Sequence, residues 1–134
     1  MKEFVPTIKV SFCLTGNTFN IEYITNKLGL IPTKARRKED FPVQSIKAGV
    51  AKTYWCIEIK EQSIETIPTF NKLINILKEK NETINELCQK FNLDSSFIVT
   101  FYTNGDKTPI MELSNEIMTF ANSINATISF DIYH

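Results

Sequence analysis

Alternation of apolar and polar residues marks three strands along the chain. Between residues 7 and 14, four apolar side chains (Ile8, Val10, Phe12 and Leu14) alternate with polar or small ones, and residues 54–61 and 126–133 alternate in the same way. Such a period of two predicts strands that each bury one face. Residues 96–103 are rich in β-branched and aromatic residues and apolar on both faces, which predicts a fourth strand in a central position of the sheet.

Helical spacing separates these strands. Ile21, Ile24 and Leu28 lie on one helix face, and Gly29 is a plausible C-terminal stop. A second amphipathic helix contains Phe70, Leu73 and Leu77, with Pro68 allowed in its first turn. The residues Thr83 to Glu86 match a capping box, so the chain either breaks near Asn81 or continues as one long helix. Ser114 is the predicted N-cap of a last helix that contains Ile117, Phe120, Ala121 and Ile124.

The order of these elements predicts the fold class. Because three of the four firm strands alternate cleanly, we expect a mostly antiparallel sheet with helices on one face only. The prediction is a two-layer α+β sandwich of the ferredoxin-like class. At 134 residues the chain has the size of one domain, spanning residues 1–134. Residues 33–49 show only weak alternation and could form an edge strand, a hairpin or a loop.

Composition excludes several classes of function. Fifteen Lys and Arg residues balance fifteen Asp and Glu residues, and this lack of a basic excess makes nucleic-acid binding unlikely. The single histidine, His134, argues against most histidine-based catalysis and metal binding. No glycine-rich phosphate loop is recognisable. We therefore predict no enzyme, no catalytic residue, no metal and no cofactor; a general base at Asp131 or Glu58 with a tyrosine acid is the remaining enzymatic alternative.

The cysteines and the apolar runs bear on the compartment. Cys13, Cys56 and Cys88 are odd in number, widely separated and without a CxxC pair, so we interpret them as free thiols in a reducing cytoplasm. Cys13 and Cys56 would be neighbours if their two strands pair. No secretory leader and no apolar run of membrane-spanning length is recognisable, and a cytoplasmic location without membrane contact is expected.

The face of the sheet that the helices leave open is the first candidate binding surface. Alternation places three kinds of residue there, namely tyrosines, charged residues and small polar residues: Lys9, Ser11, Cys13, Tyr54, Cys56, Glu58, Ser129, Asp131 and Tyr133. Tyr102 joins them if Phe97, Val99 and Phe101 point inward. Tyr54, Tyr102, Tyr133 and Asp131 would make this face able to bind a partner or ligand. The alternative is a merely amphipathic face, or one covered by another segment or subunit.

A basic cluster is the second candidate. Residues 34–38 hold four cations, including Arg36 and Arg37, the only arginines of the chain. These arginines could bind phosphate, nucleic acid or an acidic partner. Alternatively, their charges protect an exposed edge strand against aggregation. Glu39 and Asp40 follow directly and offset half of the local charge.

Several short segments, taken in order, carry a resemblance to a known family. They are Phe12-Cys-Leu-Thr-Gly16, Ile24-Thr-Asn-Lys-Leu-Gly-Leu-Ile-Pro-Thr33, Trp55-Cys-Ile57, Glu112-Leu-Ser-Asn-Glu-Ile117 and Ile128-Ser-Phe-Asp-Ile-Tyr133. Through these segments the chain resembles, over nearly its whole length, the bacterial family catalogued as domain of unknown function 4279. The resemblance implies one intact small bacterial domain and brings no activity, cofactor or catalytic residue with it.

These observations lead to two hypotheses of different classes. The first is a non-enzymatic interaction domain that binds a protein partner or itself through the open sheet face or an edge strand. Toxin-neutralising immunity proteins are one setting for such a domain. The second is a sensor that holds a small anionic ligand with Arg36 or Arg37 beside the sheet.

Overall fold

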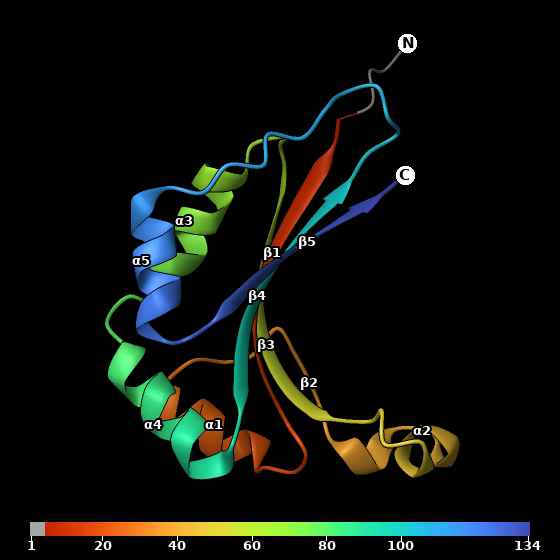
Figure 1. The fold of residues 1–134 in the computed structure, drawn as a ribbon, viewed down its shortest axis with the longest axis vertical. Helices are drawn as coiled ribbons and strands as arrows, with labels where there is room; N and C mark the ends of the chain where they lie inside the picture. Colours follow the sequence, from red (N-terminus) through yellow and green to blue (C-terminus); the bar gives the residue numbers. More distant parts are fainter. Residues whose placement is uncertain (1–4) are drawn as a thin grey trace.

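Five strands of the chain hydrogen-bond into one twisted sheet in the computed structural model, which describes residues 5–134 (Figure 1). The strands run in the spatial order β2-β3-β1-β4-β5. Three neighbouring pairs are antiparallel, and β4 and β5 are parallel. The strands are β1 (Thr7–Gly16), β2 (Lys34–Arg36), β3 (Thr53–Gln62), β4 (Asp94–Tyr102) and β5 (Thr127–Tyr133).

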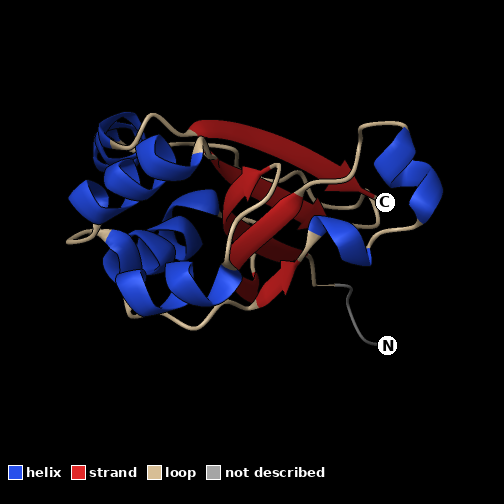
Figure 2. Ribbon diagram, turned by 90° about the horizontal axis from the view of Figure 1, so that it is seen from below, coloured by secondary structure: helices blue, strands red, loops and turns tan. Residues whose placement is uncertain are grey.

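Four helices cover one face of this sheet, as Figures 1 and 2 show. The fifth helix, α2, lies apart from them beyond the end of β2 (Figure 1). None of the helices described is long and apolar enough to cross a membrane. The helices are α1 (Ile21–Leu28), α2 (Val43–Lys47), α3 (Thr66–Leu77), α4 (Asn81–Phe91) and α5 (Asn115–Ser123).

The predicted α+β sandwich is confirmed, with a mixed sheet of five strands. The order β1, α1, β2, β3, α3, β4 follows the β-α-β-β-α-β succession of split βαβ folds, with η1 and α2 inserted between β2 and β3, α4 inserted between α3 and β4, and α5 and β5 added at the end. The ferredoxin-like class itself stays a prediction.

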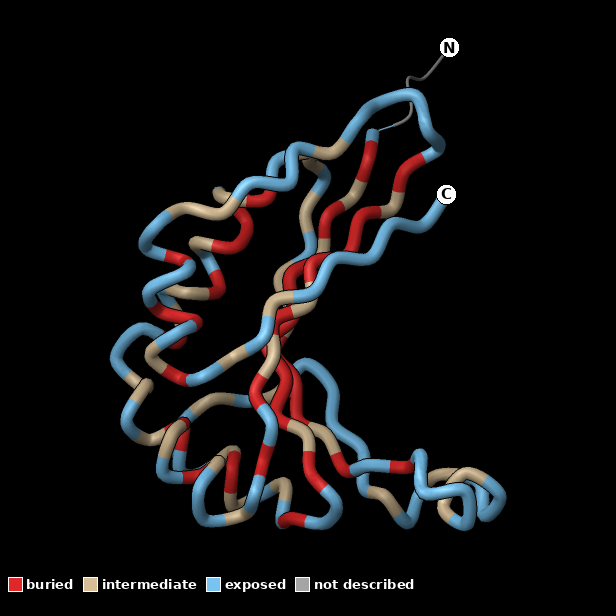
Figure 3. Tube along the Cα trace, in the orientation of Figure 1, coloured by how far each residue is buried: buried red, intermediate tan, exposed pale blue. Residues whose placement is uncertain are grey.

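The core lies between the sheet and its four covering helices. Strand register places Leu14 opposite Trp55 and Val10 opposite Val99, and all four side chains are fully buried. Figure 3 shows this buried stripe along the middle strands. The Trp55 indole N–H donates to the Thr25 hydroxyl at 3.0 Å, so the buried ring keeps a hydrogen-bond partner.

Two predicted helix ends are confirmed, because each has the local chemistry that a cap requires. Gly29 adopts a left-handed conformation after α1, which glycine accepts without a Cβ clash. Ser114 accepts a hydrogen bond from the Ile117 N–H at 3.2 Å and caps α5.

The capping box at Thr83 was the wrong interpretation. The chain does break, but α4 begins at Asn81 with Lys80 at the N-cap, so Thr83 lies inside the helix. The Ile84 N–H already donates to the Lys80 carbonyl at 2.9 Å, which leaves Thr83 no terminal N–H to cap.

Residues 33–49, for which the sequence allowed an edge strand, a hairpin or a loop, contain the edge strand β2. The segment also contains a 3₁₀ turn, η1 (Lys38–Asp40), and the short helix α2. None of the residues in these three elements is buried, which explains why no apolar pattern in the sequence predicted them.

Candidate binding surface

Strand register brings the predicted open-face residues together on the side of the sheet opposite the helices. Ser11 lies opposite Glu58, Cys13 opposite Cys56, and Tyr102 opposite Tyr133 on the neighbouring strand. The alternation of β4 is as expected, since Phe97, Val99 and Phe101 are fully buried on the helix side.

Cys13 and Cys56 form a disulfide, so the prediction of free thiols was wrong for this pair. The two residues are directly opposed on β1 and β3 with their Cα atoms 4.2 Å apart. At such a non-hydrogen-bonded position of an antiparallel pair, side chains approach each other closely. Cys88 stays a free, half-buried thiol, and burial raises its pKa above the ordinary value, helped by the nearby charge of Asp94.

One aromatic group lies at the β5 side of the open face. The rings of Tyr102 and Tyr133 stack at a centroid distance of 5.6 Å, with 17° between their planes. The ammonium groups of Lys60 and Lys9 lie 5.4 and 5.8 Å from the Tyr102 centroid. Both distances are within the range of cation–π attraction. Lys9 and Lys60 are also cross-strand neighbours, so two like charges flank one tyrosine pair.

A second aromatic group lies toward β2. The rings of Tyr54 and Phe41 meet edge to face at 6.4 Å. The Arg36 guanidinium lies 4.1 Å from the Phe41 centroid, and the Lys34 ammonium lies 5.9 Å from that of Tyr54. The same combination of tyrosine and cation therefore occurs twice on this face.

Glu58 connects the two groups. Its carboxylate accepts a hydrogen bond from the Ser11 hydroxyl at 2.9 Å and pairs with Lys34 at 3.2 Å and Lys9 at 3.7 Å. Burial by itself would raise the pKa of Glu58, but the hydrogen bonds and the two lysine charges outweigh it and lower the pKa below its ordinary value. Glu58 therefore stays ionised and holds the lysines in place near neutral pH.

A hollow of about 300 Å³ opens beside Tyr54 and Lys34, at the Cys13–Cys56 disulfide. Its mixed lining of aromatic, aliphatic, sulfur and hydroxyl groups suits a protruding side chain of a partner better than a purely polar ligand. The lining residues are Cys13, Thr15, Lys34, Tyr54, Cys56, Ser96 and Ile98.

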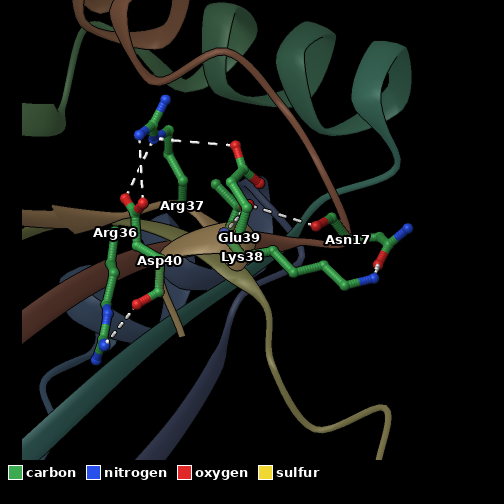
Figure 4. Close-up of polar contacts among 7 residues, drawn as sticks. Asn17, Arg36, Arg37, Lys38, Glu39 and Asp40 are labelled. Carbon is green, nitrogen blue, oxygen red and sulfur yellow. Dashed lines mark hydrogen bonds and ion pairs between the residues drawn. The ribbon is translucent and has the colours of Figure 1, made fainter. Parts of the chain in front are cut away.

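The two arginines of the basic cluster have different surroundings (Figure 4). Arg37 donates two hydrogen bonds to the Asp40 carboxylate, at 3.1 and 3.2 Å, and lies 3.9 Å from Glu39. The bond and charge of Asp40 raise the pKa of Arg37 above its ordinary value. Arg36 instead donates to the Asp40 carbonyl at 3.0 Å and lies opposite Tyr54 in the sheet. Only Arg36 therefore belongs to the tyrosine-bearing face.

Asp131 lies on the open side of β5, opposite Thr100, and is exposed. It has no ion pair among the described residues. Within residues 5–134, no three His, Cys, Asp or Glu side chains gather closely enough to hold a metal ion.

Sequence reasoning did not place two residues, Lys34 and Phe41, on this surface. Lys34 and Phe41 come from the segment without an apolar pattern, and their proximity to Tyr54 depends on how β2 pairs with β3. Lys60 lies within the predicted strand 54–61 and shares the alternation of Tyr54 and Glu58, so the pattern already placed it on this face; its contact with the Tyr102 ring comes from the structure.

The family comparison covers almost the whole chain. The model of the family described as domain of unknown function (DUF4279) matches residues 6–134. No curated protein and no solved structure matches the chain.

Proposed function

The chain belongs to the DUF4279 family of domains of unknown function, and we propose that it is a non-enzymatic protein-interaction domain. Its open sheet face binds an acidic segment of a partner protein that also carries an apolar or aromatic side chain. The single observation that carries this proposal is the repeated pairing of tyrosine with cations on one uncovered face.

The charges on this face favour an acidic partner. Four cations (Lys9, Lys34, Arg36 and Lys60) share it with three carboxylates (Glu58, Asp94 and Asp131), although the whole chain is neutral. Asp94, the first residue of β4, lies opposite Thr15, which in turn lies opposite Tyr54, so this carboxylate is two strands away from the second aromatic group. Among the described residues, no carboxylate forms an ion pair with Arg36 or Lys60. These two charges are available to a partner carboxylate.

The tyrosines supply the other half of the interaction. Their rings are amphipathic and lose little conformational entropy on binding, which is why tyrosine is enriched at interfaces. An immunity-protein role would be one case of this function, with a toxin as the partner. The alternative of a small anionic-ligand sensor has less support, because the Arg37 guanidinium is already engaged by Asp40.

Selection from a displayed library of random peptides tests the proposal. We expect the wild-type domain to enrich acidic peptides with an aromatic or apolar residue. A double variant, Tyr54→Ser with Tyr102→Ser, should bind the same peptides at least tenfold more weakly, and Lys60→Glu should also weaken them. Binding should decrease as salt increases.

Tyr23→Ser is the matched control. Tyr23 is on α1 and contacts Phe91 and Lys90 on the helix side, so its loss should leave the affinity unchanged. Selection that enriches no peptide class, or peptides that bind the double variant as well as the wild type, would contradict the proposal.

A further inference from the structure

The last strand, β5, forms an edge of the sheet with no strand beyond it among residues 5–134. Nearly all of its residues are exposed, and Figure 3 shows the strand mostly in pale blue. Two large apolar side chains on its helix side are 37% exposed (Phe130) and 44% exposed (Ile132). Edge strands of monomeric proteins are usually short, charged or covered.

The opposite edge has these protections and β5 does not. Strand β2 has three residues, two of them cations (Lys34 and Arg36), and it leads directly into η1. Strand β5 has seven residues, no proline and one charged side chain, Asp131. The difference between the two edges favours pairing of β5 with a further strand.

The backbone shows which residues of β5 would make the pairing. The Thr103 N–H donates to the Tyr133 carbonyl at 2.9 Å, so the backbone groups of Tyr133 point toward β4. Because the direction alternates along a strand, Ser129 and Asp131 also point toward β4. Ile128, Phe130 and Ile132 therefore direct their N–H and C=O groups to the free edge.

From this arrangement we infer that β5 pairs antiparallel with β5 of a second copy of the chain, about a two-fold axis at Phe130. In this register all seven residues of each strand overlap, and Ile128 lies opposite Ile132 of the other copy. The outward-directed backbone groups face each other, as the hydrogen-bonded pairs of an antiparallel ladder require.

Charge distinguishes this register from its neighbours. An axis at Phe130 places the Asp131 carboxylate opposite the Ser129 hydroxyl, which can donate to it. An axis at Asp131 would place two carboxylates directly opposite each other, a destabilising pair. An axis at Ser129 would leave Ile132 and Tyr133 without a strand partner. The sequence of β5 is thus complementary to itself in one register.

The dimer extends the surface described above, and it is independent of that surface's partner. A two-fold axis perpendicular to the sheet keeps both open faces on the same side, so the two tyrosine-bearing faces become one ten-stranded surface. Phe130 points to the helix side, whereas Tyr133 points to the open side. Dimerisation and partner binding can therefore be removed separately.

Light scattering during size-exclusion chromatography tests the inference, over a range from about 5 μM to about 0.5 mM. We expect the mass to increase with concentration from the 15.4 kDa of one chain to twice that value. Because residue 130 lies on the axis and meets its own copy, Phe130→Lys and Phe130→Asp should each be monomeric. An equimolar mixture of the two variants should recover a heterodimer, since lysine then meets aspartate.

Ile31→Lys is the control, because Ile31 is 87% exposed and far along the chain from β5. It should dimerise like the wild type. Peptide binding by Phe130→Lys should be retained, so a failed dimer and a failed open-face proposal give different results. Circular dichroism checks that each variant is folded.

Hydrogen exchange tests the inference on the wild-type protein alone, without any substitution. The amides of Ile128, Phe130 and Ile132 should become protected as concentration increases, whereas those of Ser129 and Asp131 stay protected throughout by β4. A monomer over the whole concentration range, or a dimer that both charged variants leave intact, would overturn the inference.

Discussion

Breaking the Cys13–Cys56 disulfide should destabilise the fold more than any single change on the open face. The bond joins two strands across a sequence separation of 43 residues. The chain-entropy relation for a loop of that length gives about 4 kcal/mol of lost stability on reduction. Both cysteines are buried, so the double variant Cys13→Ala with Cys56→Ala also loses packing in the hollow.

Urea unfolding followed by tryptophan fluorescence measures this effect. Trp55 is the only tryptophan and is fully buried, so its emission reports exposure of the core. With a urea dependence of about 2 kcal/mol/M, a loss of 4 kcal/mol lowers the midpoint by about 2 M. The oxidised protein, once denatured, should show one reactive thiol, that of Cys88.

Cys88→Ala is the matched control, since it keeps the disulfide and should respond to reduction as the wild type does. Two results would refute the reasoning. One is three reactive thiols in the denatured, unreduced protein, and the other is a midpoint that reduction leaves unchanged.

Three further predictions follow from single residues. Glu58→Gln should lower the free energy of unfolding by about 1 to 2 kcal/mol at pH 7. Because the pKa of Glu58 is lowered in the fold, its contribution to stability is full above the ordinary value of 4.5 and is lost as pH falls below it. The free energy of unfolding of the variant, measured by acid unfolding, should therefore change less with pH than that of the wild type. Thr25→Val removes the acceptor of the buried Trp55 N–H and should cost about 1 to 3 kcal/mol in urea unfolding, whereas Thr25→Ser should cost less because it keeps the hydroxyl. Cys88 should react with iodoacetamide more slowly than glutathione at about pH 7.5, since burial raises the pKa of its thiol, and equal rates in the folded state would contradict this.

Much of the fold was predictable because most strands bury one face and so carry a period of two. The alternation of residues 7–14 and 54–61 located β1 and β3, and the tyrosine-bearing face followed from the same pattern. The segment containing β2 and α2 was not predictable, because none of the residues in these elements is buried and no apolar period marks it. Thr83 shows the converse, a capping pattern that the helix does not use.

The disulfide could not be predicted from each strand considered separately. Each strand alone places its cysteine on the open face, and pairing of β1 with β3 makes the two neighbours. Their direct opposition depends on a register that no local pattern encodes. The cation–π contacts of Lys34 and Arg36 have the same origin, since they depend on the register of β2 against β3.

The two faces of β5 explain how one short strand can serve both proposed interactions. Its odd-numbered side chains, Asp131 and Tyr133 among them, face the open surface, while Phe130 and Ile132 face the helix side. Their backbone groups alternate in the same way, with Tyr133 bonded toward β4 and Phe130 directed to the free edge. A second copy therefore takes the edge without displacing the Tyr102–Tyr133 stack. Pairing would instead place two such stacks on one continuous sheet, so a partner with two acidic segments would bind the dimer more tightly than a partner with one.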